Sequence, residues 1–415
     1  MTRARSGTGG GLPPSVPMTT VDVAYHLATR GGPLPVVFVF WFSGRAPTLD
    51  AVRARVADRA PTVPSLRYGI VRDRTVFRRA DRFAVEQHVH EARLPADDDG
   101  SAPGRMMLTH PMAGGGRPSW DVWLLRGDDG YALCYRTDHA LQDGVGAAHA
   151  VRALLDDHPE AGGPPPARLA RPTARGLVNA VGDVVASLRG GRPMPAFDGT
   201  EMRNGVVCHA ETSLARLRAI GRPRGGTVND VYLAALAHAV HTWHMKETGT
   251  AHPPLPVVIP MSVRTAGEEH APGNRMIVAR LLLPCDEPKP GRALTRVMAA
   301  TDRLRTSRQR DATRLLLASA PRAVGARLGT RMVNGAVVAG PASSVNFGQA
   351  LVHQGAAARR AAVFADLAGS VPWVVTLTSQ HDTACLSVVH DASVGGAREL
   401  PDLWLAALLE LEQTA

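Results

Sequence analysis

Cysteine is scarce in this chain: only four of its 415 residues are cysteine. Cys134, Cys208, Cys285 and Cys385 stand alone in apolar or strand-like segments, and no Cys-x-x-Cys pair occurs. The spacing therefore does not support a zinc cluster or a dithiol redox motif. Isolated, reduced thiols are typical of a cytoplasmic protein, which is the location we predict.

Segments that would indicate several other protein classes are also missing. No apolar run approaches the length of a membrane span, and the Gly/Pro-rich residues 1–17 lack the apolar stretch of a signal peptide. We expect these residues to form a disordered tail. There is no Gly-x-Ser-x-Gly nucleophile elbow, which argues against an α/β-hydrolase. Residues 114–116 are glycines, but no Lys-Ser/Thr follows them, so a nucleotide phosphate loop is not expected.

Acidic residues are outnumbered by basic ones, and nearly all of the positive charge is arginine. The chain has 47 Lys and Arg against 37 Asp and Glu, a formal net charge of +10. Such a balance can suit a nucleic acid, an anionic membrane surface or an anionic substrate. The arginines are scattered rather than interleaved with aromatic residues, so we expect no nucleic-acid partner. Attraction of a phosphorylated coenzyme or carrier protein stays open, as does peripheral contact with a membrane.

The length of the chain and its 45% hydrophobic content predict a well-packed protein of two domains. Strand-like and helix-like segments alternate in both halves, which predicts a mixed α/β (α+β) fold. We divide the chain into a tail (1–17), a first lobe (18–160), a linker or crossover (161–205) and a second lobe (206–415). We expect a monomer.

Two kinds of pattern predict the individual elements. Apolar runs and alternation predict strands at 36–42, 118–125, 131–137, 206–211, 256–263, 275–283, 371–377 and 383–389. Apolar residues at helical spacing predict helices at 49–59, 177–188, 227–240, 290–317 and 400–412. The strand at 131–137 and a helix that begins after residue 144 enclose the main chemical signal of the chain.

That signal is the motif His139-x-x-x-Asp143-Gly144. A histidine at the end of a strand is held in a fixed position, and its ordinary pKa allows it to take a proton from an alcohol, amine or thiol near neutral pH. Asp143 is too close in the chain to be an independent second catalyst, so we expect it to turn away and support the loop. Gly144 is expected to allow a tight turn where a side chain would clash. The alternative is a surface histidine ahead of an ordinary helix.

Two other clusters carry weaker signals. His238, His241 and His244 are spaced by three, so on a helix they rotate progressively off one face and form a poor metal-ligand set. We expect structural or solvated histidines and no metal site. Asn229 follows Thr227 at a helix start, where capping alone explains the residue types, so a functional role for Asn229 stays open.

Several segments, in the same order along the chain, resemble the bacterial wax ester synthase/diacylglycerol acyltransferase family. This family lies within the superfamily of coenzyme-A-dependent acyltransferases and nonribosomal peptide condensation domains. The matching segments, from about residue 22 to the C-terminus, are RPSWD (117–121) for RPLWE, DHALQDG (138–144) for HHxxxDG, TVNDVYLA (227–234) for TVNDVVLA, PMSVRT (260–265) with GNR (273–275) for VSVR…GNR, and SSVNFG (343–348) for SNVPGP.

The resemblance implies two similar lobes that form a V around a central tunnel. It implies that His139 faces the tunnel and acts as general base on an acceptor hydroxyl, which attacks an acyl thioester without a covalent acyl-enzyme. Asp143 would pair with an arginine, for which Arg264 is the candidate. The resemblance also implies a pocket or oxyanion region, for which the candidates are Asp138, Trp120, Asn229, Asn274, Ser343 and Ser344.

The same resemblance implies the substrates. We expect no bound cofactor; the co-substrate would be acyl-CoA or an acyl carrier protein with a phosphopantetheine thioester. The acceptor would be a small alcohol, as in secondary metabolism, and the product an ester. Two alternatives stay open: an amide-forming condensation enzyme that acts on carrier-bound substrates, and a catalytically silent binding protein of the same fold.

The chain departs from the family pattern at two places. Asp138 stands where the family has the first histidine of its motif, and Ser344 and Asn346 replace the Asn and Pro of the SNVPGP loop. Adjacent residues at a strand end point to opposite faces. We therefore expect Asp138 to face away from the tunnel and to find a hydrogen-bond donor within its own lobe.

Overall fold

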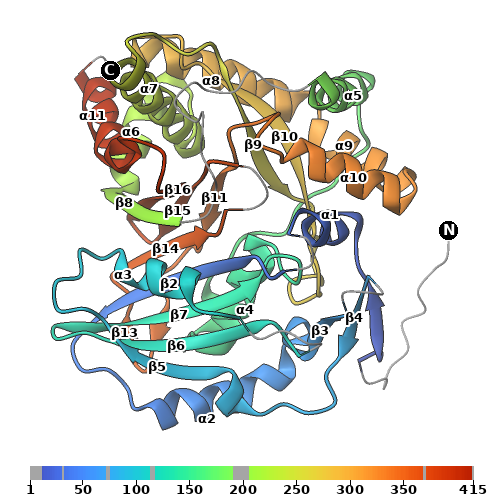
Figure 1. Ribbon diagram of the computed structural model, residues 1–415, viewed down its shortest axis with the longest axis vertical. Coiled ribbons are helices and arrows are strands. Elements are labelled where there is room, and N and C mark those ends of the chain that lie inside the picture. The colour runs from blue at the N-terminus through green and yellow to red at the C-terminus, as the bar shows by residue number, and fades with distance from the viewer. Residues whose placement is uncertain are drawn as a thin grey trace.

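Two β-sheets organise the chain, one in each of two lobes (Figure 1). The computed structural model describes residues 12–29, 32–71, 75–112, 117–189, 205–367 and 371–413. In the view of Figure 1 the first lobe lies below and the second lobe above, with helix α1 (Thr20–Ala28) between them. The predicted mixed α/β class is confirmed.

The five-stranded sheet of the first lobe has the order β14-β2-β7-β6-β5. β5 and β6 run parallel, and the other neighbouring strands run antiparallel. The strands are β2 (Pro35–Ser43), β5 (Val89–Arg93), β6 (Trp120–Arg126), β7 (Gly130–Asp138) and β14 (Arg360–Ala365). β7 lies in the middle of this sheet and ends directly before His139, so the position of that residue is set by a central strand.

β2 is apolar along nearly its whole length because helices cover both faces of this sheet. Alternate side chains point to opposite faces of a strand. Phe38 and Phe40 pack in the core that includes α2 and α4, whereas Val37 and Val39 pack in the core that includes α3. These helices are α2 (Leu49–Arg59), α3 (Ala102–Thr109) and α4 (Gly144–Leu155). A strand buried on both faces has a continuous apolar sequence, as this one does.

A small three-stranded sheet corrects the predicted tail. β1 (Ser15–Pro17) pairs antiparallel with β4 (Val76–Arg79), which also pairs with β3 (Tyr68–Val71). The end of the predicted tail is therefore a strand, because its backbone groups complete the ladder of β4. Residues 1–11 lie outside the described residues.

The second lobe contains a four-stranded sheet of order β11-β15-β16-β8 and a two-stranded ladder of β9 and β10. β11 and β15 run parallel, and the other pairs are antiparallel. The strands are β8 (Gly205–Ser213), β9 (Leu255–Ser262), β10 (Met276–Leu283), β11 (Ala342–Asn346), β15 (Trp373–Gln380) and β16 (Thr383–Asp391). The connection from β9 to β10, residues 263–275, reaches the loop that carries His139.

Helices surround the second lobe, with α6, α7 and α11 on one side of Figure 1 and α5, α9 and α10 on the other. They are α5 (Ala174–Arg189), α6 (Leu214–Gly221), α7 (Val228–Thr248), α8 (Pro290–Thr306), α9 (Gln309–Ser319), α10 (Arg322–Met332) and α11 (Leu400–Gln413). The single helix predicted at 290–317 is wrong: it is divided into α8 and α9, because Arg308 takes a left-handed φ of 54°. Within the described part of the chain, no helix is both long and apolar enough to cross a membrane.

The second half of the chain also builds part of the first lobe. β14 lies beside β2 in the first-lobe sheet, and β12 (Val352–His353) and β13 (Ala356–Ala357) form a hairpin nearby. The predicted boundary at residue 206 therefore assigns β14 to the wrong sheet, since strand pairing follows tertiary contact and not proximity in the chain. Of the predicted linker, residues 190–204 lie outside the described residues, and the predicted helix at 177–188 is confirmed as α5.

Candidate active site

His139 lines a cavity between the two lobes. Its backbone N–H donates to the Leu34 carbonyl (2.8 Å), which ties it to the start of β2. The cavity walls come from α1, from β9, β10, β11 and β15 of the second lobe, and from the segment after β14; they include Tyr25, Val258, Val278, Ser343, Asp366 and Val374. His139 on the first lobe therefore faces side chains of the second.

The imidazole of His139 is stacked and half-buried. The ring of Tyr25 lies parallel to it, with centroids 4.0 Å apart and an interplanar angle of 22°. Burial lowers the pKa of His139 below its usual value; its own carbonyl and the carboxylates of Asp143 and Asp138 oppose this shift without cancelling it. A neutral imidazole at neutral pH can accept a proton, which is what a general base requires.

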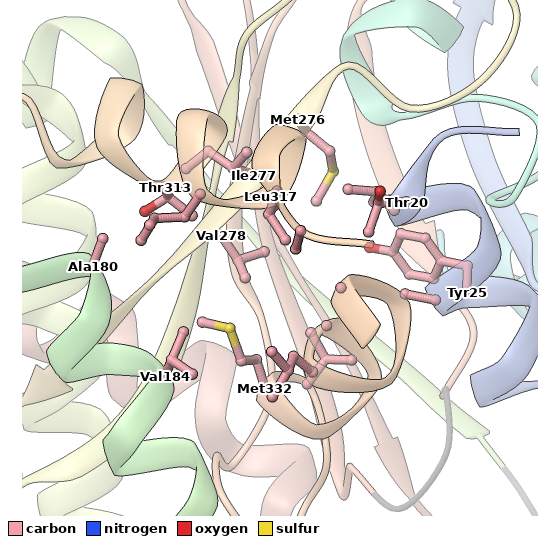
Figure 2. Close-up of a pocket in the computed structure, with 18 residues that line it drawn as sticks. Thr20, Tyr25, Ala180, Val184, Met276, Ile277, Val278, Thr313, Leu317 and Met332 are labelled. Atoms are coloured by element: carbon pink, nitrogen blue, oxygen red, sulfur yellow. The ribbon is translucent and has the colours of Figure 1, made fainter. Parts of the chain in front are cut away.

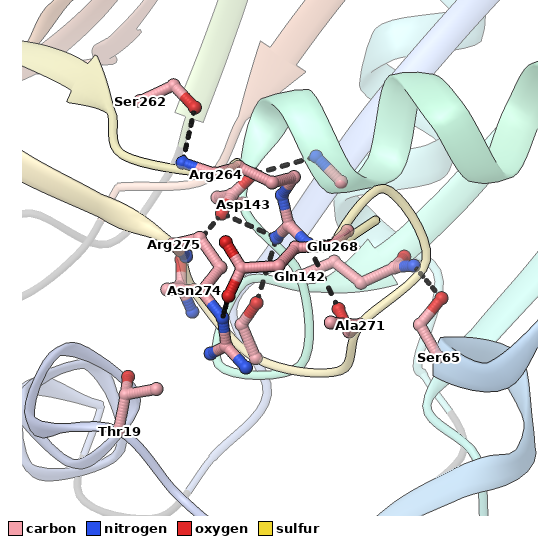
Figure 3. Close-up of polar contacts among 12 residues, drawn as sticks. Thr19, Ser65, Gln142, Asp143, Ser262, Arg264, Glu268, Ala271, Asn274 and Arg275 are labelled. Carbon is pink, nitrogen blue, oxygen red and sulfur yellow. Dashed lines mark hydrogen bonds and ion pairs between the residues drawn. The ribbon is translucent and has the colours of Figure 1, made fainter. Parts of the chain in front are cut away.

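Asp143 makes the predicted ion pair with Arg264. Its Oδ2 accepts from Arg264 Nη2 (2.8 Å) and from the Arg275 backbone N–H (2.6 Å), and its Oδ1 accepts from the Gly146 N–H as the N-cap of α4 (2.7 Å; Figure 3). The two side chains are 3% and 2% exposed. Burial alone would raise the pKa of Asp143, but Arg264 and the two backbone donors lower it below its usual value. The predicted pair is confirmed, and it joins the two lobes.

Arg264 holds the connection between β9 and β10 in shape. Besides Asp143, its guanidinium donates to the carbonyls of Glu268 (2.6 Å), Ala271 (3.2 Å) and Gly273 (3.0 Å; Figure 3). The Gly273 N–H in turn donates to the carbonyl of Leu141, inside the His139 motif (2.7 Å). Removing either charge of the pair would leave the other buried with these contacts incomplete.

The glycine prediction needs correction. Gly144 is the first residue of α4 with an ordinary negative φ, and an added Cβ would meet only a methyl group of Val345 at 3.4 Å. A side chain there does not clash. A side chain is disfavoured instead at Gly146, where a Cβ would lie 2.7 Å from Arg264 Nη2, and at Gly273, which has a φ of +84°. At Gly146, just after the motif, the close packing of Arg264 and not a tight turn favours glycine.

Asp138 lies where the sequence predicts. Its side chain is buried, and its Oδ1 accepts from the backbone N–H groups of Leu34 (3.3 Å) and Ala140 (3.0 Å), both in the first lobe. The prediction of a donor within its own lobe is confirmed. Asp138 still acts on the site electrostatically, because its charge raises the pKa of His139.

Two further predicted residues adjoin His139. Ser343 of β11 lines the cavity, and Asn274 donates from Nδ2 to the His139 carbonyl (2.7 Å). Ser344 is the next residue of β11, points to the opposite face and is exposed, so its assignment to the pocket is wrong.

Trp120 and Asn229 do not line the cavity. Trp120 is buried in the first-lobe core, where its indole N–H donates to the Leu66 carbonyl (2.9 Å) and its ring stacks on His88. Asn229 lies in the first turn of α7, within the second lobe. Both assignments to the pocket are wrong, because their motif segments build the cores of the lobes.

The three histidines of α7 serve separate contacts. His241 Nδ1 lies 2.8 Å from the Cys285 carbonyl, His244 Nδ1 lies 2.7 Å from the Thr250 carbonyl, and His238 lies 3.4 Å from the Glu410 carboxylate. Among the described residues, no group of three potential metal-ligating side chains comes together.

An apolar pocket adjoins the His139 cavity. It lies among α1, α5, α9, α10 and β10, with Tyr25 at one end and Ala180 and Val184 at the other (Figure 2). Tyr25, Val278 and Val333 line both spaces, so Tyr25 stands at their junction. The volumes are about 110 Å³ for the apolar pocket and about 70 Å³ for the His139 cavity.

Sequence reasoning missed three residues of this region. Tyr25 and Asp366 lie in segments without a recognisable motif, and burial raises the pKa of the Asp366 carboxyl. Asp22 is the third residue of α1, where it forms a capping box with Thr19. The spacing Thr-x-x-Asp was a readable signal for that helix start.

The comparison with protein families agrees with this geometry. A model described as the wax ester synthase/diacylglycerol acyltransferase catalytic domain matches residues 39–192. That segment contains β7, the whole His139 motif and α4. The predicted resemblance to this family is confirmed.

Curated relatives match only part of the chain. A Mycobacterium tuberculosis protein named for an inferred diacylglycerol O-acyltransferase activity is 27% identical over 259 residues, which cover 50% of this chain and 52% of the relative. A second such protein from the same organism is 25% identical over 250 residues, covering 50% and 54%. The chain thus spans about half the length of the curated relatives it matches.

Solved structures share the fold over nearly the whole chain. The wax ester synthase/diacylglycerol acyltransferase from Marinobacter aquaeolei VT8 has a TM-score of 0.65 at 19% identity, covering 96% of this chain and 99% of that one. The first condensation domain of the calcium-dependent antibiotic synthetase has a TM-score of 0.65 at 14% identity, covering 96% and 95%. At these identities the similarity establishes the fold alone.

The family match and the site overlap only in part. His139, Asp143 and Gly146 lie inside the matched segment, whereas Arg264 and Asn274 lie beyond residue 192. The latter two reach the site through the connection between β9 and β10. The site around His139 is thus completed by residues from the other lobe.

Proposed function

We propose that this protein is an O-acyltransferase that forms an ester from an acyl thioester and an alcohol, with His139 as general base. The observation that carries the proposal is the placement of a half-buried imidazole, with a lowered pKa, in a cavity between the lobes. The Asp143–Arg264 pair supports the loop beneath it. The matched family model, which describes an acyltransferase catalytic domain, agrees with this chemistry.

The reaction is a direct transfer. A ring nitrogen of His139 takes the proton of the acceptor hydroxyl as its oxygen attacks the thioester carbonyl carbon. The resulting tetrahedral oxyanion collapses, the carbon–sulfur bond breaks, and the leaving thiolate takes the proton from His139. Ser343 lines the same cavity, and its hydroxyl is our candidate donor to the oxyanion.

The shapes of the two spaces favour particular substrates. The pocket beyond Tyr25 is lined almost wholly by apolar side chains, which suits the acyl chain of the donor (Figure 2). One solved neighbour, a starter condensation domain of rhizomide synthetase, is described in complex with C8-CoA and Leu-SNAC. We therefore propose acyl-CoA or a carrier-bound acyl thioester as the donor. The smaller cavity at His139 favours a small alcohol as acceptor, as in secondary metabolism.

The test is incubation of the protein with a panel of acyl-CoA and carrier-bound acyl thioesters as donors and of alcohols and amines as acceptors. Both free thiol and ester product are measured, because thiol release without ester shows hydrolysis only. Ester formation that disappears in His139→Ala supports the proposal. Product only from amine acceptors would point to the amide-forming alternative, and no turnover with CoA or carrier-bound donors would point to a silent binding protein.

A further inference from the structure

Asp22 links helix α1 to the backbone of His139. Its Oδ1 accepts from both the backbone N–H (2.6 Å) and the side-chain amide (2.8 Å) of Asn274. The same amide nitrogen donates to the His139 carbonyl (2.7 Å). A single asparagine thus connects a carboxylate of α1 to the main chain of the general base.

The surroundings of Asp22 are built around its carboxylate. The side chain is 0% exposed, and its Oδ2 accepts from the Thr19 N–H (2.6 Å). Gly273 leaves room for it, since a Cβ there would lie 2.6 Å from Oδ2. Burial raises the pKa of Asp22 to about 6, while hydrogen bonds from Asn274 and Thr19 oppose the shift. The carboxylate oxygens of Asp22 therefore accept from neutral donors. Two of these donors belong to Asn274, which also donates to the His139 carbonyl.

Helix α1 meets the imidazole at a second point. Tyr25 lies three residues after Asp22, so both side chains project from neighbouring positions on one side of the helix. The Tyr25 ring stacks on the imidazole while Asp22 acts on the backbone through Asn274. α1 itself packs on α10 of the second lobe, where Thr330 donates to the Ala24 carbonyl (3.2 Å).

We propose that Asp22 is a positioning residue of the acyl transfer: through Asn274 it holds the His139 backbone, and with it the imidazole, at the cavity. The inference rests on the proposed function and adds to it a residue outside the His139 motif and outside the matched segment 39–192. The hydrogen bonds of Asp22 reach His139 through Asn274, so its effect on the imidazole is indirect.

The chain provides a matched control for the helix-capping part of this role. Thr227 and Asp230 form the same capping box at the start of α7, and Asp230 is 1% exposed. The second contact of Asp230, however, is the Thr301 hydroxyl of α8 (2.5 Å), within the second lobe. Asp22→Ala and Asp230→Ala therefore remove comparable caps, and only the first removes a contact to the residue that holds His139.

The experiment measures kcat and KM for ester formation in both variants. We expect Asp22→Ala to lower kcat about ten- to a hundred-fold, because misplacing a catalytic group by a fraction of an ångström has effects of this order. KM for the acyl thioester should change by less than about three-fold. Asp230→Ala should keep wild-type kcat although it lowers the melting temperature. Asp22→Asn keeps the oxygen that accepts from Asn274, so its kcat should lie between those of Asp22→Ala and the wild type. If Asp22→Ala does not fold, the kcat of Asp22→Asn relative to the wild type tests the inference instead.

A second readout does not depend on turnover. The imidazole signals of nitrogen-15-labelled histidine are recorded by NMR, and the His139 signal is assigned by its loss in His139→Ala. Asp22→Ala should displace this signal and Asp230→Ala should not. The inference would be overturned if the His139 signal and kcat were unchanged in the Asp22 variants. It would also be overturned if Asp230→Ala lowered kcat and displaced the His139 signal as much as Asp22→Ala does. A wild-type protein without transferase activity would refute the proposed function alone, and the NMR comparison would still decide the role of Asp22.

Discussion

The loop around His139 and the first turns of α7 have similar local structure but different surroundings. Both are helix starts with a buried aspartate: Asp143 is the N-cap of α4, and Asp230 is the third residue of α7 in a capping box with Thr227. Both helices are apolar and carry histidines. Asp143 of the first pairs with Arg264 of the opposite lobe, whereas Asp230 of the second reaches Thr301 of its own lobe. His139 lines a cavity between the lobes, whereas His241 lies against a carbonyl of a neighbouring strand end. Of these two helix starts, the one that the opposite lobe contacts is the one that carries the candidate active site.

Replacing the two histidines should give the largest contrast. We expect His139→Ala to lower the rate of ester formation by roughly two to four orders of magnitude, as loss of a general base does. His241→Ala should leave the rate unchanged, because its ring serves a structural contact. Initial rates at saturating substrates, with melting curves to verify folding, check this. Near-normal turnover in His139→Ala would refute the assignment of the base.

Breaking the buried ion pair should affect stability more than any other change in the comparison. Asp143→Asn or Arg264→Ala should destabilise the protein by about 3–5 kcal/mol, because a buried charge loses its partner. Lys246 of α7 pairs with Glu399 on the surface, with the two side chains 56% and 46% exposed. Lys246→Ala should cost under about 1 kcal/mol. Denaturant unfolding measures both, and equal effects would contradict the structural role of the pair.

Gly144 of the His139 motif and Gly146, two residues later in α4, should differ in their tolerance of a side chain. Gly146→Ala places a Cβ against the Arg264 guanidinium and should cost about 1–3 kcal/mol, as overpacking does. Gly144→Ala meets only ordinary contact and should change the free energy of unfolding by less than about 1 kcal/mol. Thermal melts of the two variants decide this, and the reverse order of stability would restore the tight-turn explanation for Gly144.

The smallest expected effect concerns the charge next to the base. Asp138 raises the pKa of His139, so Asp138→Asn should lower that pKa further. Activity needs the neutral imidazole, which is lost as pH falls through this pKa; the acidic limb of the pH–rate profile should therefore move to lower pH, by less than about one unit. Glu410→Gln, beside His238 near α7, should leave the profile in place. A shift in the opposite direction would show that Asp138 acts in another way.

Much of the local structure was predictable from particular residues. The continuous apolar run of β2 indicated a strand buried on both faces, and Thr227 with Asp230 indicated the start of α7. His139 followed from its motif, and Arg264 followed from the family resemblance. These signals work because strand burial, helix capping and short motifs depend on residues that are near one another in the chain.

Other features could not be predicted in this way. β14 has an unremarkable composition, and only its pairing with β2 places residues of the second half in the first-lobe sheet. Trp120 and Ser343 were equal candidates for the pocket, yet one is in a core and the other lines the cavity. The requirement for glycine lies at position 146 and not 144 because of an arginine 118 positions along the chain, at Arg264.

The sequence by itself determined the mixed α/β class, the position of His139 at the end of a strand, and the aspartate that supports its loop. Only the tertiary structure decided that Asp22 and Asn274 hold the His139 backbone, that Tyr25 stacks on its ring, and that an apolar pocket lies beyond. The physical reason is how far apart along the chain the contacting residues lie. Capping and strand patterns are set by neighbours within a few residues, whereas the contacts of His139 come from segments as far apart as α1 and the connection between β9 and β10, which meet only when the two lobes pack together.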